Sequence, residues 1–355
     1  MCVCCARADD NGEHFNRSLV IWPNTAMYSS MQLLPSGEVA LLFEREKGPT
    51  LGGGLNISLV RFNVSDLKPA TKPVPAPAPP PFIPHPATEL RVSNVLGSGM
   101  VLQRAPALAR IWGLATPGDV VTVRVSSAHG NLTATAAADG RWALRVGLTT
   151  AGNPHTISIS SARGKPVAPI VLSDVLAGEV HFCSGQSNMD FRLGGVFNAS
   201  HECAVATNPM LRLFTAASNT SSVPLYELTA PPSTWSNGSG WLVASPESAC
   251  GVQWRTSLTR GTGFSAACFL YANELQRRLF VPVGAVDASW GGTNIEAFMS
   301  AQAMAACPSH TDPGPSEIPT PSLLYNAMIQ PFAPMTLAVS RPYSLDLSGP
   351  RSFPP

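Results

Sequence analysis

A short polar motif in the second half of the chain has the composition of a nucleophilic turn. The hexapeptide SGQSNM at 184–189 directly follows a predicted strand, Val180–Cys183. A serine hydroxyl at the carboxyl end of a strand, on a turn that opens a helix, lies near free backbone N–H groups that can stabilise a developing oxyanion. Gly185 permits the close backbone approach that such a turn needs. The motif therefore predicts a nucleophile at Ser187, with Gln186 and Asn188 as neighbouring oxyanion or substrate contacts.

A second glycine turn has the same strand–glycine–helix form. The segment SWGGTNIEA at 289–297 follows a predicted strand. A backbone amide of Gly291 or Gly292, or the Thr293 side chain, could point at the same carbonyl oxygen as the amide of Ser187. An ordinary turn between a strand and a helix has a similar composition, and only the companion motif favours a catalytic interpretation.

The elements that must position both turns begin at about residue 169. From there apolar strand patterns alternate with apolar residues at helical spacing, which predicts an α/β domain with a parallel sheet covered by helices on both faces. The expected elements are a strand region at 169–185, a helix at 264–279, a strand at 282–289, helices at 295–303 and 323–329, and a strand at 335–339.

The preceding region, 88–168, has a different pattern. Short alternating strands are separated by turn signals such as Pro117-Gly118-Asp119 and Asp139-Gly140. This spacing predicts a small β-sandwich, and because the region holds no titratable cluster we expect a structural or substrate-framing role. The expected strands are 109–112, 120–125, 132–136, 142–146 and 156–160.

Two further segments precede this region. Half of the residues in 69–86 are proline, which fixes φ and removes a hydrogen-bond donor, so 69–87 is expected to be an extended linker. The alternative is a ligand for a proline-recognition module. Residues 1–68 contain a hairpin pattern around Pro35-Ser36-Gly37 and a strand at 56–63. Three strands give too little core to be stable alone, so this part is expected to be a β-hairpin remnant of a larger β structure.

The composition excludes several classes of function. In 355 residues, 45% are apolar and 13% are charged, with a formal net charge of +1. Without a basic excess we expect neither nucleic acid nor a membrane as a partner. The longest apolar runs, such as 279–286, are far shorter than a membrane span. A neutral protein of two or three domains is expected.

Sequons and cysteines bear on the compartment. The start of the chain, MCVCCARADD, does not have the pattern of a signal peptide, yet seven sequons begin at Asn16, Asn56, Asn63, Asn131, Asn198, Asn219 and Asn237. We expect a secreted or lysosomal protein whose N-terminus has been lost. Cys2, Cys4 and Cys5 match no zinc spacing, so no metal or other cofactor is expected. Disulfides among Cys203, Cys250 and Cys307 are possible, with the pairing left open.

The segments around both motifs resemble a known family. VLAGEVHFCSGQSNM, GAVDASWGGTNIEAF and SLLYNAMIQPF look like successive blocks of the sialate O-acetylesterases in the SGNH hydrolase superfamily, and MVLQRAPALARIWGLATPGD and DGRWALRV look like the β domain of that family. The resemblance spans roughly 90–339. It implies a flavodoxin-like catalytic domain and metal-free hydrolysis of O-acetyl esters on sialic acids or other acetylated glycans. It also implies an acyl-enzyme at Ser187, with the Ser187 amide and the Gly291/Gly292 region as oxyanion donors.

The chain departs from the family pattern after residue 339. The family has a Trp-Tyr-Gln-Gly-Glu segment there and, later, an Asp-x-x-His that supplies the general base; neither occurs in this sequence. We therefore expect a C-terminally truncated catalytic domain. Of the seven histidines, His310 and His201 are weak candidates for a base, and His181 is expected to be packed or to face solvent. The competing hypothesis is an inactive carbohydrate-binding or scaffold protein that has lost the triad.

A second, partial resemblance concerns residues 1–68. Tyr28-Ser29-Ser30-Met31, the run at 41–44 and the strand at 57–62 resemble the last propeller blade of exo-sialidases. The resemblance implies that Tyr28 corresponds to the catalytic tyrosine of that family. The other residues of a sialidase site do not occur in this segment, so it is expected to be inert, and a generic β remnant is the alternative.

Overall fold

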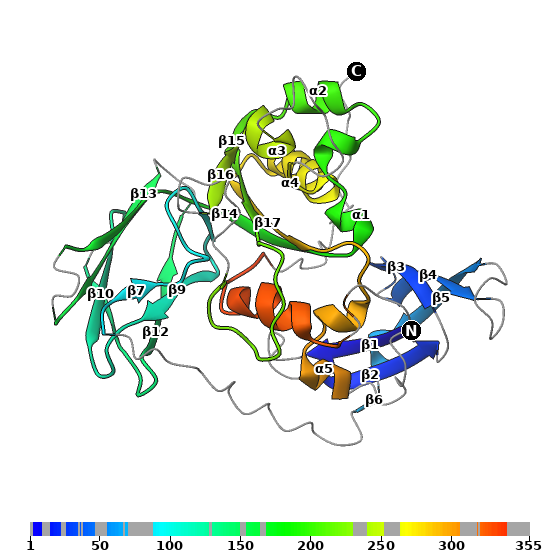
Figure 1. Ribbon diagram of the computed structural model, residues 1–355, viewed down its shortest axis with the longest axis horizontal. Coiled ribbons are helices and arrows are strands. Elements are labelled where there is room, and N and C mark those ends of the chain that lie inside the picture. Colours follow the sequence, from blue (N-terminus) through cyan, green and yellow to red (C-terminus); the bar gives the residue numbers. More distant parts are fainter. Residues whose placement is uncertain are drawn as a thin grey trace. The chain divides into compact units, whose positions relative to one another are not determined.

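The computed structural model describes residues 3–8, 15–22, 26–34, 36, 38–46, 55–66, 68–69, 88–127, 130–149, 154–163, 168–229, 240–251, 263–305, 318 and 320–338. They belong to two compact units (Figure 1). Unit 1 comprises 1–77, 301–314 and 339–355, and unit 2 comprises 78–300 and 315–338. Each unit is described by itself.

Unit 1 contains two antiparallel sheets. One has the order β3 (Ala26–Leu33), β4 (Glu38–Glu46) and β5 (Leu55–Asn63), so the hairpin and the following strand are confirmed. The other has the order β1 (Val3–Ala8), β2 (Phe15–Trp22) and β6 (Lys68–Pro69), which the sequence patterns did not reveal. The helix α5 (Ala301–Ala305) also belongs to this unit. The predicted linker lies outside the described residues apart from Pro69.

Unit 2 is built on one eight-stranded mixed sheet. Its order is β11-β10-β13-β14-β17-β15-β16, with β8 (Val101–Gln103) paired to β14. The long strand β14 (Ile170–Gly185) is parallel to β17 (Val283–Ser289), which in turn is parallel to β15 (Asn208–Thr215). The edge strand β16 (Trp241–Ala244) is antiparallel to β15. The mixed α/β class is thus confirmed. The flavodoxin-like order needs more parallel strands than the described residues provide and stays a prediction.

The strands of 88–168 divide between two sheets. The expected strands correspond to β9 (Leu108–Leu114), β10 (Val120–Val125), β11 (Leu132–Thr135), β12 (Arg141–Gly147) and β13 (His155–Ser161). β10, β11 and β13 join the large sheet, whereas β12, β9 and β7 (Arg91–Val92) form a separate one. Buried side chains of both sheets, among them Trp112, Trp142 and Ile157, share one hydrophobic cluster. Because β14 continues from this region into the parallel part, a separate β-sandwich domain stays a prediction.

Helices cover both faces of the parallel strands (Figure 1). On one face α4 (Ala266–Leu279) packs with buried residues of β15 and β17. On the other face Phe332 of η5 (Gln330–Phe332) contacts Phe182 and Phe214, next to the π-helical turn η4 (Tyr325–Ile329). Shorter helices complete the unit: α1 (Ser187–Asp190), η2 (Leu193–Gly195), α2 (Ala199–Ala204), α3 (Pro246–Cys250) and η3 (Ile295–Phe298).

Two predicted elements differ in the structure. The helix expected at 295–303 is interrupted, because η3 ends at Phe298 and α5 begins at Ala301. The strand expected at 335–339 is absent as far as it is described, up to Ala338. Only one backbone hydrogen bond, from Ala338 N–H to Val180 O at 2.8 Å, links it to β14, and one bond does not make a strand ladder.

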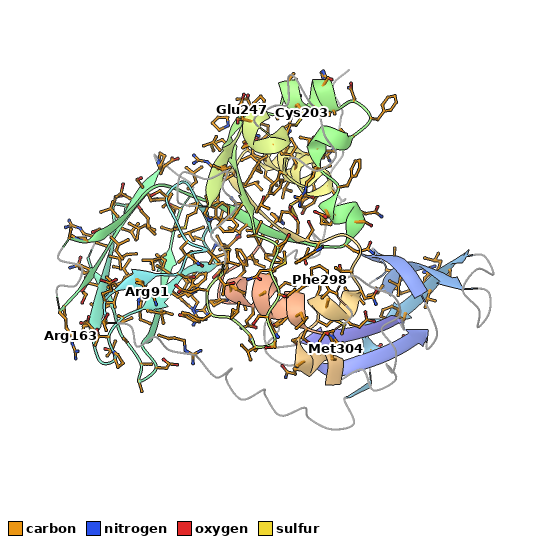
Figure 2. All side chains as sticks on the ribbon, viewed as in Figure 1. Arg91, Arg163, Cys203, Glu247, Phe298 and Met304 are labelled. Atoms are coloured by element: carbon orange, nitrogen blue, oxygen red, sulfur yellow. A yellow bond between two sulfur atoms is a disulfide. The ribbon has the colours of Figure 1, made fainter. Side chains whose placement is uncertain are left out.

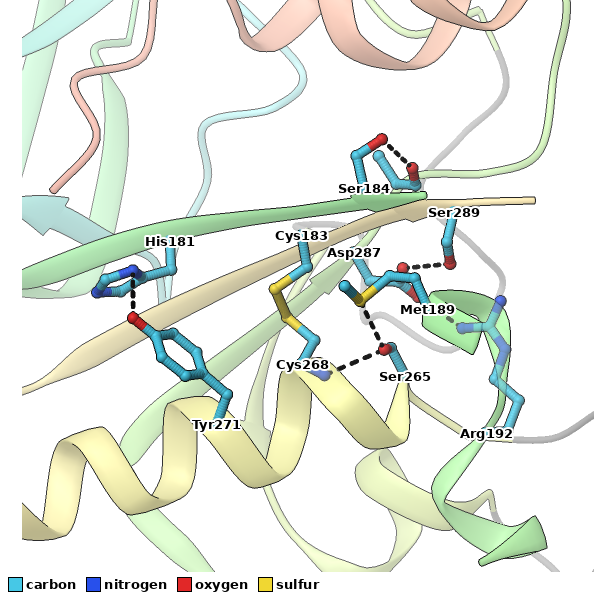
Figure 3. Close-up of a disulfide and its surroundings, with 11 residues drawn as sticks. His181, Cys183, Ser184, Met189, Arg192, Ser265, Cys268, Tyr271, Asp287 and Ser289 are labelled. Atoms are coloured by element: carbon cyan, nitrogen blue, oxygen red, sulfur yellow. Dashed lines mark hydrogen bonds and ion pairs between the residues drawn. A yellow bond between two sulfur atoms is a disulfide. The ribbon is translucent and has the colours of Figure 1, made fainter. Parts of the chain in front are cut away.

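Two disulfides stabilise the face that carries α4. Cys183 of β14 is bonded to Cys268 of α4 (Figure 3), and Cys203 of α2 is bonded to Cys250 of α3. The second pair lies within the set considered from the sequence; the first had not been anticipated. Cys307 lies outside the described residues. Side chains fill the space between the elements of unit 2, including Cys203 (Figure 2). No helix in the described residues is long and apolar enough to cross a membrane.

Candidate active site

The two glycine turns lie side by side at the carboxyl ends of adjacent parallel strands. In the β14–β17 register Gly185 is opposite Ser289, and Trp290 N–H donates to Gly185 O at 3.0 Å. Parallel strands end at the same edge of a sheet, so the residues that follow each strand necessarily meet there. The structure therefore brings the two motifs predicted from the sequence into one place.

Gly185 allows β14 to turn sharply into α1. Its φ is +153°, and a Cβ added to it would lie 3.2 Å from the Cβ of Met189. A side chain at this position would be both conformationally strained and crowded. The helix that follows is a single turn, and the Ser265 hydroxyl donates to Met189 Sδ at 3.5 Å, which connects this turn with the start of α4.

The Ser187 hydroxyl lies at the surface and has a neutral partner. Both Ser187 and Asn188 are exposed. The Ser187 Oγ–H donates to Gln186 Oε1 at 2.6 Å, and the Ser187 backbone N–H donates to the same oxygen at 3.0 Å. Gln186 thus caps α1 and orients the hydroxyl, but an amide oxygen is too weak a base to remove its proton at neutral pH.

The second turn approaches the serine closely through Gly291. A Cβ added to Gly291 would lie 3.6 Å from the Ser187 Cα and 3.8 Å from its Cβ. The Gly291 N–H donates to Asp190 Oδ2 at 3.0 Å. Gly292 has a φ of +73°, and the buried Thr293 donates its hydroxyl to Trp290 O at 2.6 Å, which closes the turn. Thr293 therefore shapes the turn.

Charged residues that the sequence analysis missed connect the two turns. Asp190 of α1, Arg192 and Asp287 of β17 form successive ion pairs, and the Ser289 hydroxyl donates to Asp287 Oδ1 at 2.6 Å. Burial raises the pKa of the Asp287 carboxyl, while the charge of Arg192 opposes that shift. An acidic residue inside the otherwise apolar strand sequence PVGAVDAS was the signal that could have identified this cluster.

No histidine lies in hydrogen-bond contact with Ser187 in the part of the chain that the structure describes. His181 faces α4, where its ring meets Tyr271 edge-on with centroids 5.3 Å apart (Figure 3). Burial lowers the pKa of His181, and the nearby Glu179 carboxylate opposes this effect. His201 is exposed on α2, and His310 lies outside the described residues.

Two other expectations concern sites beyond this turn pair. Tyr28 is on β3 in unit 1, at an irregularity in the register with β4, and its sialidase-like role stays a prediction. Among the described residues, no group of three or more His, Cys, Asp or Glu side chains is arranged to hold a metal ion.

Comparison with known proteins identifies esterases as relatives. No protein-family model matches the chain. The sialate O-acetylesterases of Pongo abelii and Homo sapiens are each 31% identical to it over 264 residues, which are 70% of this chain and 47% of the relative. That of Mus musculus is 29% identical over 285 residues. The chain thus spans about half the length of the curated relatives it matches.

A solved structure agrees with this relationship. A carbohydrate acetylesterase from Xanthomonas citri matches with a TM-score of 0.56 and 28% identity, covering 70% of this chain and 49% of that protein. The match extends to sequence as well as fold. The chain is therefore similar to sialate O-acetylesterases and to a carbohydrate acetylesterase.

Proposed function

We propose that this chain is a serine carbohydrate esterase that hydrolyses O-acetyl groups, with sialic acids as the first candidate substrate. The observation that supports this most strongly is the position of Ser187, exposed at the end of a central parallel strand with Gly291 packed against its backbone. Acetyl esters on a sugar fit this geometry because the acyl group is small and the nucleophile is open to solvent.

The reaction would proceed through an acetyl-serine. Ser187 Oγ attacks the ester carbonyl carbon and loses its proton to a base, and the carbonyl oxygen becomes an oxyanion. The backbone N–H groups of Ser187 and Gly291 are the candidate donors to that oxygen. Collapse of the intermediate breaks the bond to the sugar oxygen, which takes the proton back from the base and leaves as an alcohol. Water, giving a proton to the same base, then attacks the acetyl-serine carbonyl, and Ser187 Oγ leaves with that proton as acetate is released.

Both candidate donors are already occupied in the free chain. The Ser187 N–H is held by Gln186 and the Gly291 N–H by Asp190. Substrate binding therefore has to replace two side-chain oxygens with the oxygen of the ester. Because an oxyanion accepts stronger hydrogen bonds than an ester carbonyl, this exchange favours the transition state over the ground state.

The alternative is a carbohydrate-binding or scaffold protein without turnover. One observation favours it: within the described residues, the Ser187 hydroxyl hydrogen-bonds only to the neutral Gln186 amide. A serine without a base is a weak nucleophile, and loss of the base from such a unit typically costs several orders of magnitude in rate. The two proposals differ in whether sugar binding is followed by release of acetate.

The Ser187→Ala variant separates them. The purified chain is incubated with 4-nitrophenyl acetate, O-acetylated sialic acid and acetylated xylan, and acetate release is measured. We expect turnover that falls at least about 10³-fold in the variant. Ser173→Ala is the matched control, an exposed serine on β14, the strand that leads to Ser187, and it should retain full activity. Binding of the acetylated sugar without turnover would favour the alternative. The ratio of rates on the two sugars assigns the substrate.

The two disulfides support a secreted or lysosomal location. Such bonds persist in oxidising compartments and are rare in reducing ones. Both join elements of the parallel region, and Cys183 precedes the nucleophile turn on the same strand.

A further inference from the structure

Arg192 contacts two carboxylates that come from different parts of the site. One terminal nitrogen donates to Asp287 Oδ2 at 2.5 Å, and the other donates to Asp190 Oδ1. Asp190 ends the nucleophile helix α1, whereas Asp287 lies inside β17. Figure 3 shows Arg192 reaching from the segment after α1 toward Asp287 and Ser289. A planar guanidinium can hold two acceptors at fixed directions, which a single ammonium group cannot do.

The remaining oxygen of each carboxylate continues the connection. Ser289 Oγ donates to Asp287 Oδ1 at 2.6 Å, and the Gly291 N–H donates to Asp190 Oδ2 at 3.0 Å. All four carboxylate oxygens therefore have a donor. The result is a closed path of hydrogen bonds from β17 through Arg192 to α1, and from α1 to the glycine turn that follows β17.

Much of this path is removed from water. The side chain of Asp287 is 0% exposed, that of Arg192 is 15% exposed and that of Asp190 is 31% exposed. Ion pairs on the surface contribute little, but a charge pair removed from water is screened far less. The contact between Arg192 and Asp287 therefore attaches this path to β17 of the sheet. Asp190 then connects Arg192 to the Gly291 N–H.

We propose that Arg192 is a positioning residue that sets the distance between the Ser187 hydroxyl and the Gly291 amide. The inference rests on the proposed function, in which Ser187 is the nucleophile. Without the guanidinium, Asp190 loses its fixed orientation, and the Gly291 N–H loses the acceptor that orients it before the ester oxygen takes that acceptor's place. A misplacement of about 1 Å in such a site costs roughly 10²-fold in rate.

A purely structural role for Arg192 makes a different prediction. Arg192 also neutralises Asp287, so Arg192→Met alone leaves a buried, uncompensated carboxylate and destabilises the fold. The double variant Arg192→Met/Asp287→Asn removes that penalty, because the amide is neutral and can still accept from Ser289. If Arg192 only neutralised a charge, the double variant would recover both stability and activity.

The experiment measures unfolding by denaturant together with kcat and KM on 4-nitrophenyl acetate. We expect the double variant to regain most of the stability lost in Arg192→Met, while kcat stays about 10²-fold below that of the unmodified chain and KM changes little. The matched control is Arg212→Met/Asp174→Asn, another Arg–Asp pair with a buried arginine but away from Ser187, which should leave kcat unchanged. Recovery of kcat in the double Arg192 variant would overturn the proposal.

A second readout does not depend on catalysis. Amide hydrogen exchange of the peptide containing Gly291 is measured without substrate in the unmodified chain and in the double variant. We expect exchange at this amide to be at least about 10-fold faster in the variant, because its acceptor is no longer held. Equal protection in both proteins would overturn the role of Arg192, whatever the activity. Absence of Ser187-dependent turnover together with faster exchange would instead refute the proposed function and retain the positioning role.

Discussion

The two halves of β14 are held in place by different means. The first half, near Ile170–Val175, pairs with the antiparallel strand β13, and the second half, Glu179–Gly185, pairs with the parallel strand β17. In the first half exposed and buried positions alternate, as with Val171 and Leu172. In the second half Phe182 packs against Phe332 on one face, and Cys183 is bonded to Cys268 on the other.

The ion pairs of the two halves show the same contrast. At Asp174 the backbone bends with a φ of +54°, and the Asp174 side chain, which is 46% exposed, pairs with the buried Arg212 at 2.5 Å. In the site, Arg192 pairs with Asp287, whose side chain is completely buried. Asp174 of the first half is thus about half exposed, whereas Asp287 of β17, the strand that pairs with the second half, is completely buried.

Removal of the Cys183–Cys268 disulfide, in the second half of β14, should have the largest effect on stability. Cys183→Ala/Cys268→Ala opens a loop closed over a sequence separation of 85, and the chain-entropy model gives a loss of about 4.6 kcal/mol in unfolding free energy. We also expect slower hydrolysis, since Cys183 fixes the strand segment that leads to Ser187. Denaturant unfolding and steady-state kinetics measure the two effects.

Removal of the other disulfide is the control for that experiment. Cys203→Ala/Cys250→Ala opens a loop of sequence separation 47 between α2 and α3, and neither cysteine belongs to β14. It should cost a comparable amount of stability and leave the rate of acetate release nearly unchanged at temperatures where both variants are folded. Equal losses of rate in the two double variants would contradict a special role for the second half of β14.

Gly178, at the junction of the two halves, should be the most sensitive single position. A Cβ added there would lie 2.0 Å from Pro282 O and 2.6 Å from Pro282 C. Because the obstacle is backbone, Gly178→Ala must shift β14 relative to the start of β17, with an expected loss of about 3 kcal/mol in unfolding free energy. Thermal or denaturant unfolding provides the measurement.

Gly147→Ala is the matched comparison, at the last residue of β12. An added Cβ at Gly147 lies 3.5 Å from Leu108 Cδ2, an ordinary contact, so the loss should be below about 1 kcal/mol. If Gly178→Ala were as mild as Gly147→Ala, the close approach of β14 to the Pro282 backbone would not constrain the strand.

The elements with a clear period or a clear end were predictable from the sequence. β10 matches the expected 120–125, because strict alternation is bounded by Pro-Gly-Asp and by polar residues. β17 was expected because an apolar run ends at Gly291-Gly292. β1 and β2 were missed, since their short, mixed sequences carry no periodicity. The strand expected at 335–339 shows how an apolar run without a paired ladder misleads.

The site was predictable only in part. The position of Ser187 follows from local strand–turn–helix chemistry, and its closeness to Gly291 follows from the parallel sheet. The Arg192 cluster depends on which β-strand neighbours β14, and the Cys183–Cys268 bond depends on how α4 packs on the sheet. Tertiary contacts of this kind leave no periodic signal, so sequence reasoning finds the residues and misses their partners.

Replacement of His181, a partly buried residue in the second half of β14, should have the smallest effect on stability. Burial holds its pKa below the ordinary value of about 6.5, so the native chain keeps the ring neutral while the unfolded chain binds a proton as the pH falls below that value. Stability contributed by the neutral ring is therefore present above about pH 6.5 and lost below it. The His181→Phe variant should lose this pH dependence of stability. Between about pH 7.5 and about pH 5.5, the change in its unfolding free energy should differ from that of the unmodified chain by roughly 1 kcal/mol or less.

The Tyr271→Phe variant removes only the 3.4 Å contact to His181 Nδ1. It should keep most of the pH dependence, because burial of His181 is its main cause. A His181→Phe variant with the slope of the unmodified chain would show that this face of β14 is as open to water as the first half.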